Sequence, residues 1–277
     1  MTDFVLKVVA TVVGVGAASG LFFRDDSVYL ISDNSNYLYR YSLSADALDK
    51  VLLIADSLHE QLPKKLKRDF EAIAADGDRF YIYGSGSSDN GKRNLRITLD
   101  MESRQTDAVE AMTDSYARLR ELAGLRKDDF NLEGAIHRDG NVYLFNRGNG
   151  PNQMNSIFKL DAANRDTTFL PVELPELGGV RTALTDAVMV GGDTVYFLAA
   201  AEDTESAYHD GAVNGTLLGT LSLPDFTLGD YILISDSHKF EGITFVEADT
   251  KHLTFFLCED PDNGEQATAL YRLTLNR

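Results

Sequence analysis

The chain is poor in cysteine, histidine and basic residues, and each shortage excludes a class of function. Its single cysteine, Cys258, cannot form an internal disulfide and rules out a metal site built on cysteine pairs. Five histidines stand against 43 aspartates and glutamates, so a bound metal is expected to have oxygen ligands. Only 26 lysines and arginines balance those acids, and the net charge of −17 opposes binding to nucleic acid or to anionic lipid.

Long apolar runs are also scarce. The segment from Val8 to Phe23 has the small, apolar composition of a signal-peptide core, although Asp3 makes its leader poorly cationic. The alternating pattern from Phe4 to Thr11 equally suits a β-strand. Elsewhere no uncharged apolar stretch reaches 18 residues, so no membrane span is expected. We expect a soluble monomer, and the sequence leaves open whether it is cytoplasmic or exported.

An internal repeat predicts the architecture. Five segments open with a small or acidic residue and a short apolar run, and in the first four an apolar-aromatic pair follows nine and ten residues later. The opening residues are Ser19, Glu71, Glu133, Asp186 and Glu241. Turn-forming pairs between the runs make each copy a hairpin, and further apolar runs follow it. The copies recur every 52 to 62 residues or so, the length of a four-stranded propeller blade.

The two ends of the chain complete the pattern. The last copy has three strands, whereas residues 4–13 precede the first copy and have no blade of their own. The sequence therefore predicts an all-β fold: a five-bladed β-propeller with four-stranded blades, the last closed by the N-terminal strand, as a single domain over residues 1–277. A helix from Ser115 to Ala123, capped by Asp114 or Ser115 and stopped by Gly124, interrupts the repeat. A pair of stacked antiparallel sheets is the alternative, but it does not explain the recurring register.

The repeat also predicts a site. The first strand of every blade lines the channel of a propeller, so the five opening residues should meet on one axis. Four carboxylates brought together there need a counter-charge, and Ca²⁺ suits irregular oxygen ligation better than Mg²⁺ does. We expect Ser19, Glu71, Glu133, Asp186 and Glu241 to be metal ligands. The alternative is that they accept hydrogen bonds from neighbouring strands and water, with one or two protonated.

Basic residues gather at one rim of the predicted channel. Cations precede the opening residues, and polar loops follow the second strands on the same face. An anionic small molecule is the expected ligand, since both cations and a bound metal would attract it. The candidate ligand-binding residues are Lys67, Arg68, Asn146, Arg147, Lys239 and Asp33. The alternative is that these cations only form salt bridges with the carboxylates.

The chain resembles a known family, the calcium-activated nucleotidases or soluble apyrases. The resemblance rests on the Ser19 opening, the FEAIA and LEGAI openings, the SYARLRELAGL helix and the KFEGITF opening. It implies a five-bladed propeller and places Ser19, Glu71, Glu133 and Glu241 at calcium-ligand positions, with Asp186 where a serine is usual. Similar openings occur in phytase-like and lactonase-type propellers.

Departures from the family pattern argue against nucleotide hydrolysis. The sequence Asp33-Asn34-Ser35 lacks an arginine of the family, only Arg147 matches a pair of arginines, and Ala199 to Ala201 replace a lysine. No G-x-S-x-G, H-E-x-x-H or Walker sequence supplies another mechanism. Two hypotheses remain: a metal-assisted hydrolase of a phosphorylated or other anionic small molecule, and a non-catalytic ligand- or protein-binding propeller with a structural axial metal.

Overall fold

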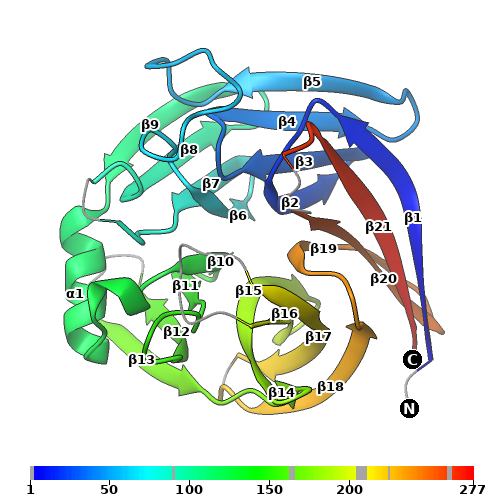
Figure 1. Ribbon diagram of the computed structural model, residues 1–277. Coiled ribbons are helices and arrows are strands. Elements are labelled where there is room, and N and C mark those ends of the chain that lie inside the picture. The colour runs from blue at the N-terminus through cyan, green and yellow to red at the C-terminus, as the bar shows by residue number, and fades with distance from the viewer. Residues whose placement is uncertain (1–2, 89–90, 162–165, 204–210, 224, 261–263) are drawn as a thin grey trace.

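Short alternating strands separated by tight turns fold into five antiparallel sheets set around a central axis (Figure 1). The structure, a computed structural model, describes residues 3–88, 91–161, 166–203, 211–223, 225–260 and 264–277. The five-bladed propeller predicted from the repeat is thereby confirmed. The chain runs outward through each sheet, so the first strand of every repeat lies nearest the axis (Figure 1).

Four blades follow the chain in order. Blade 1 contains β2 (Ala18–Arg24), β3 (Ser27–Ser32), β4 (Tyr37–Ser42) and β5 (Ala47–Leu52). Blade 2 contains β6 (Phe70–Asp76), β7 (Arg79–Gly84), β8 (Leu95–Asp100) and β9 (Gln105–Ala111). Blade 3 contains β10 (Leu132–Arg138), β11 (Asn141–Asn146), β12 (Asn155–Leu160) and β13 (Thr167–Val172). Blade 4 contains β15 (Val180–Val190), β16 (Thr194–Asp203), β17 (Ala212–Ser222) and β18 (Leu228–Ser235), and a two-residue strand, β14 (Glu176–Leu177), pairs with the start of β15.

The fifth blade joins the two ends of the chain. It contains β19 (Phe240–Ala248), β20 (His252–Glu259), β21 (Ala267–Asn276) and β1 (Phe4–Val13). β1 pairs antiparallel with β21, from Phe4 opposite Leu275 to Val13 opposite Ala267. The predicted closure by the N-terminal strand is confirmed. This pairing ties the first blade to the last through backbone hydrogen bonds, which fixes the ring.

Apolar side chains pack between adjacent blades. Leu21 and Leu30 of blade 1 meet Phe256 and Cys258 of blade 5 in one buried cluster. On the other side of blade 1, Ile31 packs with buried residues of blade 2. Because every sheet is covered on both faces near the axis, its inner strands are largely buried and the strand starts are held rigidly.

One helix is inserted between blades 2 and 3. α1 (Thr113–Ala123) buries Tyr116 and Leu119 and ends at Gly124, whose φ of 63° is the left-handed helix stop predicted from the sequence. It begins two residues earlier than predicted, and the N-cap residue is Met112, which makes no side-chain cap bond. The expected cap by Asp114 or Ser115 is therefore wrong. A short 3₁₀ helix, η1 (Lys127–Asp129), leads into blade 3.

Within the described ranges, no helix has the length and apolarity needed to cross a membrane.

Candidate functional site

A β-bulge recurs near the inner end of every blade. The pairing between first and second strands shifts across one extra residue in all five sheets. The extra residues are Ser19, Glu71, Glu133, Thr185 and Glu241. A bulged residue is left out of the ladder and its side chain is re-aimed, which is why bulges often mark functional positions.

The fourth blade departs from the sequence prediction by one residue. Its bulged position is Thr185, not Asp186. The Thr185 hydroxyl donates to the Phe240 carbonyl at 2.7 Å, as the Ser19 hydroxyl donates to the Phe70 carbonyl. Asp186 instead accepts backbone N–H bonds from Ala187 at 2.7 Å and Ile243 at 2.8 Å, so it ties β15 to β19. The sequence pattern points to Asp186 because the opening residues of the other repeats are mostly acidic, whereas the bulged position is set by strand pairing.

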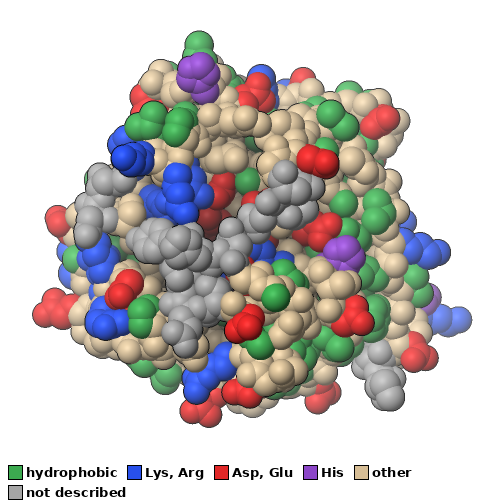
Figure 2. Space-filling model, viewed as in Figure 1, with side chains coloured by type: hydrophobic (Ala, Val, Ile, Leu, Met, Phe, Trp, Pro, Cys, Tyr) green, Lys and Arg blue, Asp and Glu red, His purple; other side chains and the backbone are tan. Residues whose placement is uncertain are grey.

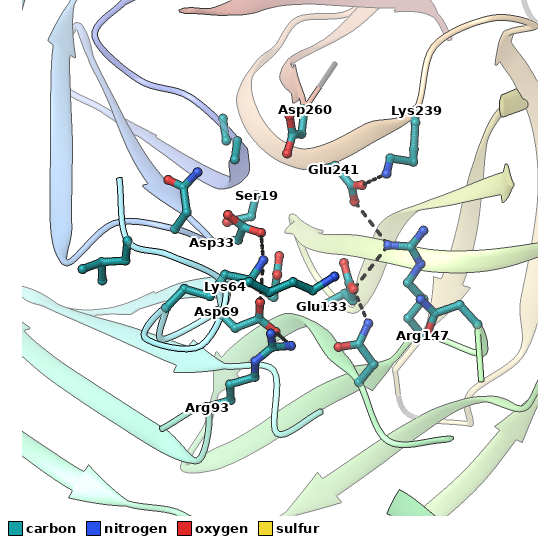
Figure 3. A pocket seen from close by; sticks show the side chains of 18 of the residues that line it. Ser19, Asp33, Lys64, Asp69, Arg93, Glu133, Arg147, Lys239, Glu241 and Asp260 are labelled. Atoms are coloured by element: carbon teal, nitrogen blue, oxygen red, sulfur yellow. Dashed lines mark hydrogen bonds and ion pairs between the residues drawn. The ribbon is translucent and has the colours of Figure 1, made fainter. Parts of the chain in front are cut away.

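A polar cavity of about 360 Å³ lies at this end of the axis (Figure 3). It opens on the face of Figure 2, where Lys and Arg side chains lie beside Asp and Glu side chains in a central hollow. Side chains two residues before the bulges, namely Ala17, Asp69, Asn131 and Lys239, also line it. Four of the five repeats thus contribute two residues to the wall, the bulged residue and the residue two positions before it. We call it the axial cavity.

One side of the axial cavity holds three carboxylates and two cations, Asp33, Asp69 and Glu71 with Lys67 and Arg93, which we call the Asp69 cluster. One ligand oxygen of each acid lies within 4.8 Å of the others. Asp69 Oδ2 accepts from Arg93 Nη1 at 2.6 Å, and Oδ1 lies 3.1 Å from Lys67 Nζ. Lys67 also pairs with Asp33. The Glu71 carboxylate makes no hydrogen bond or ion pair with any described residue.

Asp69 is held in a backbone conformation that side chains rarely adopt. Its φ of 56° is left-handed. The hydroxyls of Ser85 and Ser87 donate to its Oδ2 at 2.5 and 3.2 Å, and its N–H donates to the Asp33 carbonyl at 3.0 Å. Strain of this kind persists only where surrounding contacts enforce it, and it concentrates at functional sites.

The opposite side holds a matching set, Glu133, Glu202 and Glu241 with Arg147 and Lys239, which we call the Arg147 cluster. Arg147 reaches between Glu133 and Glu241 (Figure 3) and lies 3.3 Å from Glu133, 2.7 Å from Glu202 and 3.8 Å from Glu241. Lys239 Nζ lies 3.1 Å from Glu241. Fully ionised, each cluster carries one negative charge in excess.

This crowding displaces the carboxyl pKa values in opposite directions. Burial and then the charge of Glu133 raise the pKa of Glu71 well above its usual range. Burial raises the pKa of Glu133 to about 8, against the pull of Arg147. Burial also acts on Glu241, but Lys239 and Arg147 outweigh it and lower its pKa. The cavity therefore holds both proton-carrying and ionised carboxyl groups near neutral pH.

Residues 14–275 match the protein family described as "Family of unknown function (DUF6929)". The chain belongs to this family. None of the curated proteins matches it.

Solved structures with TM-scores above 0.5 share the fold of this DUF6929 chain at low sequence identity. The glutaminyl cyclase of Myxococcus xanthus has 12% identity and a TM-score of 0.54, over 99% of this chain and 98% of its own. A luciferin-regenerating enzyme has 10% identity and a TM-score of 0.52, over 98% and 95%. Hydrazine synthase of Kuenenia stuttgartiensis has 10% identity and a TM-score of 0.45, and this chain covers only 57% of that one. None of these is named as a nucleotidase or phytase, so that finer resemblance stays a prediction.

Eight of the residues singled out from the sequence line the axial cavity: Ser19, Glu71, Glu133, Glu241, Asp33, Lys67, Arg147 and Lys239. Asp186, Arg68 and Asn146 do not. Arg68 pairs instead with Asp56, at the outer side of the loop before β6. Asn146 is buried and accepts the Asn131 N–H at 2.9 Å while its amide donates to Asp129 and Met154 carbonyls, so it shapes the loop that presents Arg147.

Several cavity residues escaped sequence reasoning, among them Asp69, Asn131, Arg93 and Glu202. The first two had an available signal, because they stand two residues before Glu71 and Glu133 and so occupy a fixed position in the repeat. Glu202 had none, since it lies near the end of β16, a second strand that is longer in blade 4 than in the other blades. Arg93 lies in the loop after β7, and loop conformation is not encoded by the repeat.

Two further titratable side chains, His137 and Glu259, have structural partners. His137 stacks on Tyr81 at 4.0 Å and shares a hydrogen bond with the Tyr83 hydroxyl at 2.7 Å. Burial lowers its pKa to about 4, which keeps it neutral. Glu259 pairs with His238 at 2.7 Å and accepts the Tyr271 hydroxyl, whereas its neighbour Asp260 lines the cavity.

Proposed function

We propose that the axial cavity binds a divalent cation, Ca²⁺ by preference, and that the protein uses it to bind and hydrolyse an anionic small molecule. The observation that carries the proposal is the Asp69 cluster with its unpartnered Glu71. Three carboxylates converge there, and the two cations present do not neutralise them.

The donor set fits a hard cation. Ca²⁺ takes six to eight oxygen ligands at roughly 2.3–2.6 Å, so oxygens around one ion lie within about 5 Å of one another. Asp33, Asp69 and Glu71 meet that condition. Asp33 Oδ1 is also buried without a hydrogen-bond partner among the described residues. Of the five metal ligands predicted from the sequence, only Glu71 is proposed here as a ligand. Glu133 and Glu241 pair with Arg147 instead, and the Ser19 hydroxyl donates to the Phe70 carbonyl.

Lys67 is the competitor of the metal. Its ammonium pairs with both Asp33 and Asp69, two of the three carboxylates proposed as ligands. A bound cation must therefore displace or repel this ammonium. Lys67 also gives the free cavity a resident positive charge, which limits protonation of the acids around it.

Acid–base chemistry falls to the Arg147 cluster. When bound, a divalent cation supplies a Lewis acid that polarises a phosphoryl or ester oxygen. Glu133 keeps a proton near neutral pH and can donate it to a leaving oxygen, while Glu241 stays ionised. Two neighbouring carboxyls with pKa values pushed apart are a pattern of acid–base sites. Lys64 extends across the cavity (Figure 3) and offers a cation to the anionic ligand.

A second candidate is a non-catalytic propeller with a structural axial metal. The ion pairs of Lys67 and Lys239 favour it, because cations expected to hold an anionic ligand already contact cavity carboxylates. The two candidates share the metal and differ in turnover.

One experiment separates them. Purified protein is assayed with nucleoside diphosphates, phytate, aryl esters and lactones, with and without Ca²⁺, and thermal unfolding is followed in parallel. Ca²⁺-dependent turnover supports the hydrolase, and thermal stabilisation without turnover supports the binding protein.

Variants test the metal site itself. Glu71→Gln should abolish stabilisation by Ca²⁺, whereas Glu247→Gln, an exposed glutamate on β19, should retain it. Full stabilisation of the Glu71 variant would remove this residue from the metal site. No stabilisation of the wild type by any divalent cation would refute both candidates.

A further inference from the structure

A second polar cavity of about 200 Å³ adjoins the axial cavity on the side of blade 4. We call it the side chamber. Two paired alanines of blade 4, Ala183 on β15 and Ala200 on β16, line it, and their small side chains leave room there. Arg147, Asn149 and Glu202 line both cavities and so form the wall they share. A ligand pocket usually measures about 300 Å³ or more, so the chamber suits a fragment of a larger ligand.

Two polar atoms of the shared wall have no hydrogen-bond partner among the residues that the structure describes. They are the Nε of Arg147, a side chain only 7% exposed, and the buried Oδ1 of Asn149. Leaving such groups unsatisfied costs about 1–3 kcal/mol each. One is a donor and the other an acceptor, so a single group that both accepts and donates would satisfy them together.

The charges around the chamber disfavour an anion. Its other ionic residues are Glu176, Arg181, Glu202 and Asp203, three acids against one cation. Glu202 is already neutralised by Arg147 at 2.7 Å. A phosphate or carboxylate placed here would face the remaining acids, whereas a neutral hydroxyl would not. No aromatic side chain lines it among the described residues, so it offers no stacking platform for a nucleobase.

We propose that the side chamber is a subsite for the uncharged, hydroxyl-bearing part of the ligand, a sugar or polyol, whose anionic group occupies the axial cavity. This inference rests on the proposed function for the anionic end, and it names the ligand class as a phosphorylated or carboxylated carbohydrate. Ligand hydroxyls accept from Arg147 Nε and donate to Asn149 Oδ1.

Calorimetric titrations in Ca²⁺ test the subsite with three probes: inorganic phosphate, glucose 6-phosphate and glucose. Two hydrogen bonds of ordinary strength are worth about tenfold in affinity. We expect the wild type to bind glucose 6-phosphate about tenfold more tightly than phosphate. Asn149→Ala removes one of these two bonds and should cut the ratio of the two affinities to about threefold. Asn141→Ala, at the distant start of β11, is the matched control and should keep the advantage.

A second variant covers the case in which Asn149→Ala does not fold. Ala183→Leu fills the chamber from β15 with an uncharged side chain and should have the same selective effect. Equal weakening of phosphate and glucose 6-phosphate, or an advantage that survives both variants, would overturn the subsite. If the wild type binds no phosphate, the proposed function fails, and glucose alone then tests the subsite. Saturation-transfer NMR should show that glucose binds to the wild type and not to Asn149→Ala. If glucose does not bind to the wild type, the subsite is overturned.

Discussion

Replacing Arg147 by methionine tests whether the axial cavity is held together by a buried ionic cluster. The side chain is 7% exposed and pairs with Glu133, Glu202 and Glu241. Methionine keeps most of the volume and removes the charge, so three buried carboxylates lose their shared partner. Breaking a buried ion pair from one side costs about 3–5 kcal/mol. At about 2 °C per kcal/mol for a chain of this size, the melting temperature should fall by roughly 6–10 °C.

The loss should depend on pH in a defined direction. The guanidinium lowers the pKa of Glu133 and of Glu241, so without it these two carboxyls hold protons more strongly and the folded protein binds more protons than the unfolded chain. Stability then falls as pH rises through the window between the unfolded and folded pKa values. The destabilisation of Arg147→Met should therefore be larger at pH 8 than at pH 5. Urea denaturation at both pH values, with Ca²⁺ absent, measures it.

The matched control is Arg79→Met. Arg79 pairs with Asp107 at 3.2 Å, but their side chains are 57% and 39% exposed. An exposed pair of this kind contributes about 0–1 kcal/mol. If Arg147→Met at pH 8 cost no more than the control, the cluster would not be the organising feature of the cavity.

Three further substitutions test other parts of the structure. Glu133→Gln should flatten the decline in wild-type stability between pH 4.5 and about 8, because the folded protein keeps the Glu133 proton up to about 8 and the unfolded chain releases it near 4.5. Urea denaturation measures this slope, and the control Glu247→Gln should leave it unchanged. An unchanged slope in Glu133→Gln as well would contradict the raised pKa of Glu133. Lys67→Met should raise Ca²⁺ affinity by about tenfold in calorimetric titration, since a unit charge near the ion is removed, and unaltered affinity would exclude competition. Gly86→Ala should lower the free energy of unfolding by about 1–3 kcal/mol more than Gly77→Ala does. Both glycines have left-handed φ, but only at Gly86 would a Cβ lie 2.7 Å from aromatic rings. Equal losses of unfolding free energy in chemical denaturation would contradict this.

The architecture was accessible from sequence because it follows from periodicity. Each blade needs the same alternation and the same turns, so the pattern recurs and can be counted. The excess strand at the N-terminus then had one place to go, and its pairing with β21 confirms this. The start of α1 was placed less well, since Met112 serves as N-cap without a side-chain bond and so leaves no signal in the sequence.

The site was accessible only in part. Glu71, Glu133 and Glu241 could be placed because they occupy a fixed position in the repeat. Thr185 could not be told from Asp186, because a one-residue shift at a bulge is decided by strand pairing, and either residue is compatible with the pattern.

By itself, the sequence determined how many blades the chain makes, how the ring closes and which strand starts face the axis, because these depend on local alternation repeated along the chain. Only the tertiary structure decided which charges meet. Arg147 and Lys67 were predicted to face a ligand, yet each lies against carboxylates from other blades or loops. Such pairings depend on distances of a few ångströms between segments far apart in sequence, and electrostatic energy is set by those distances and by burial.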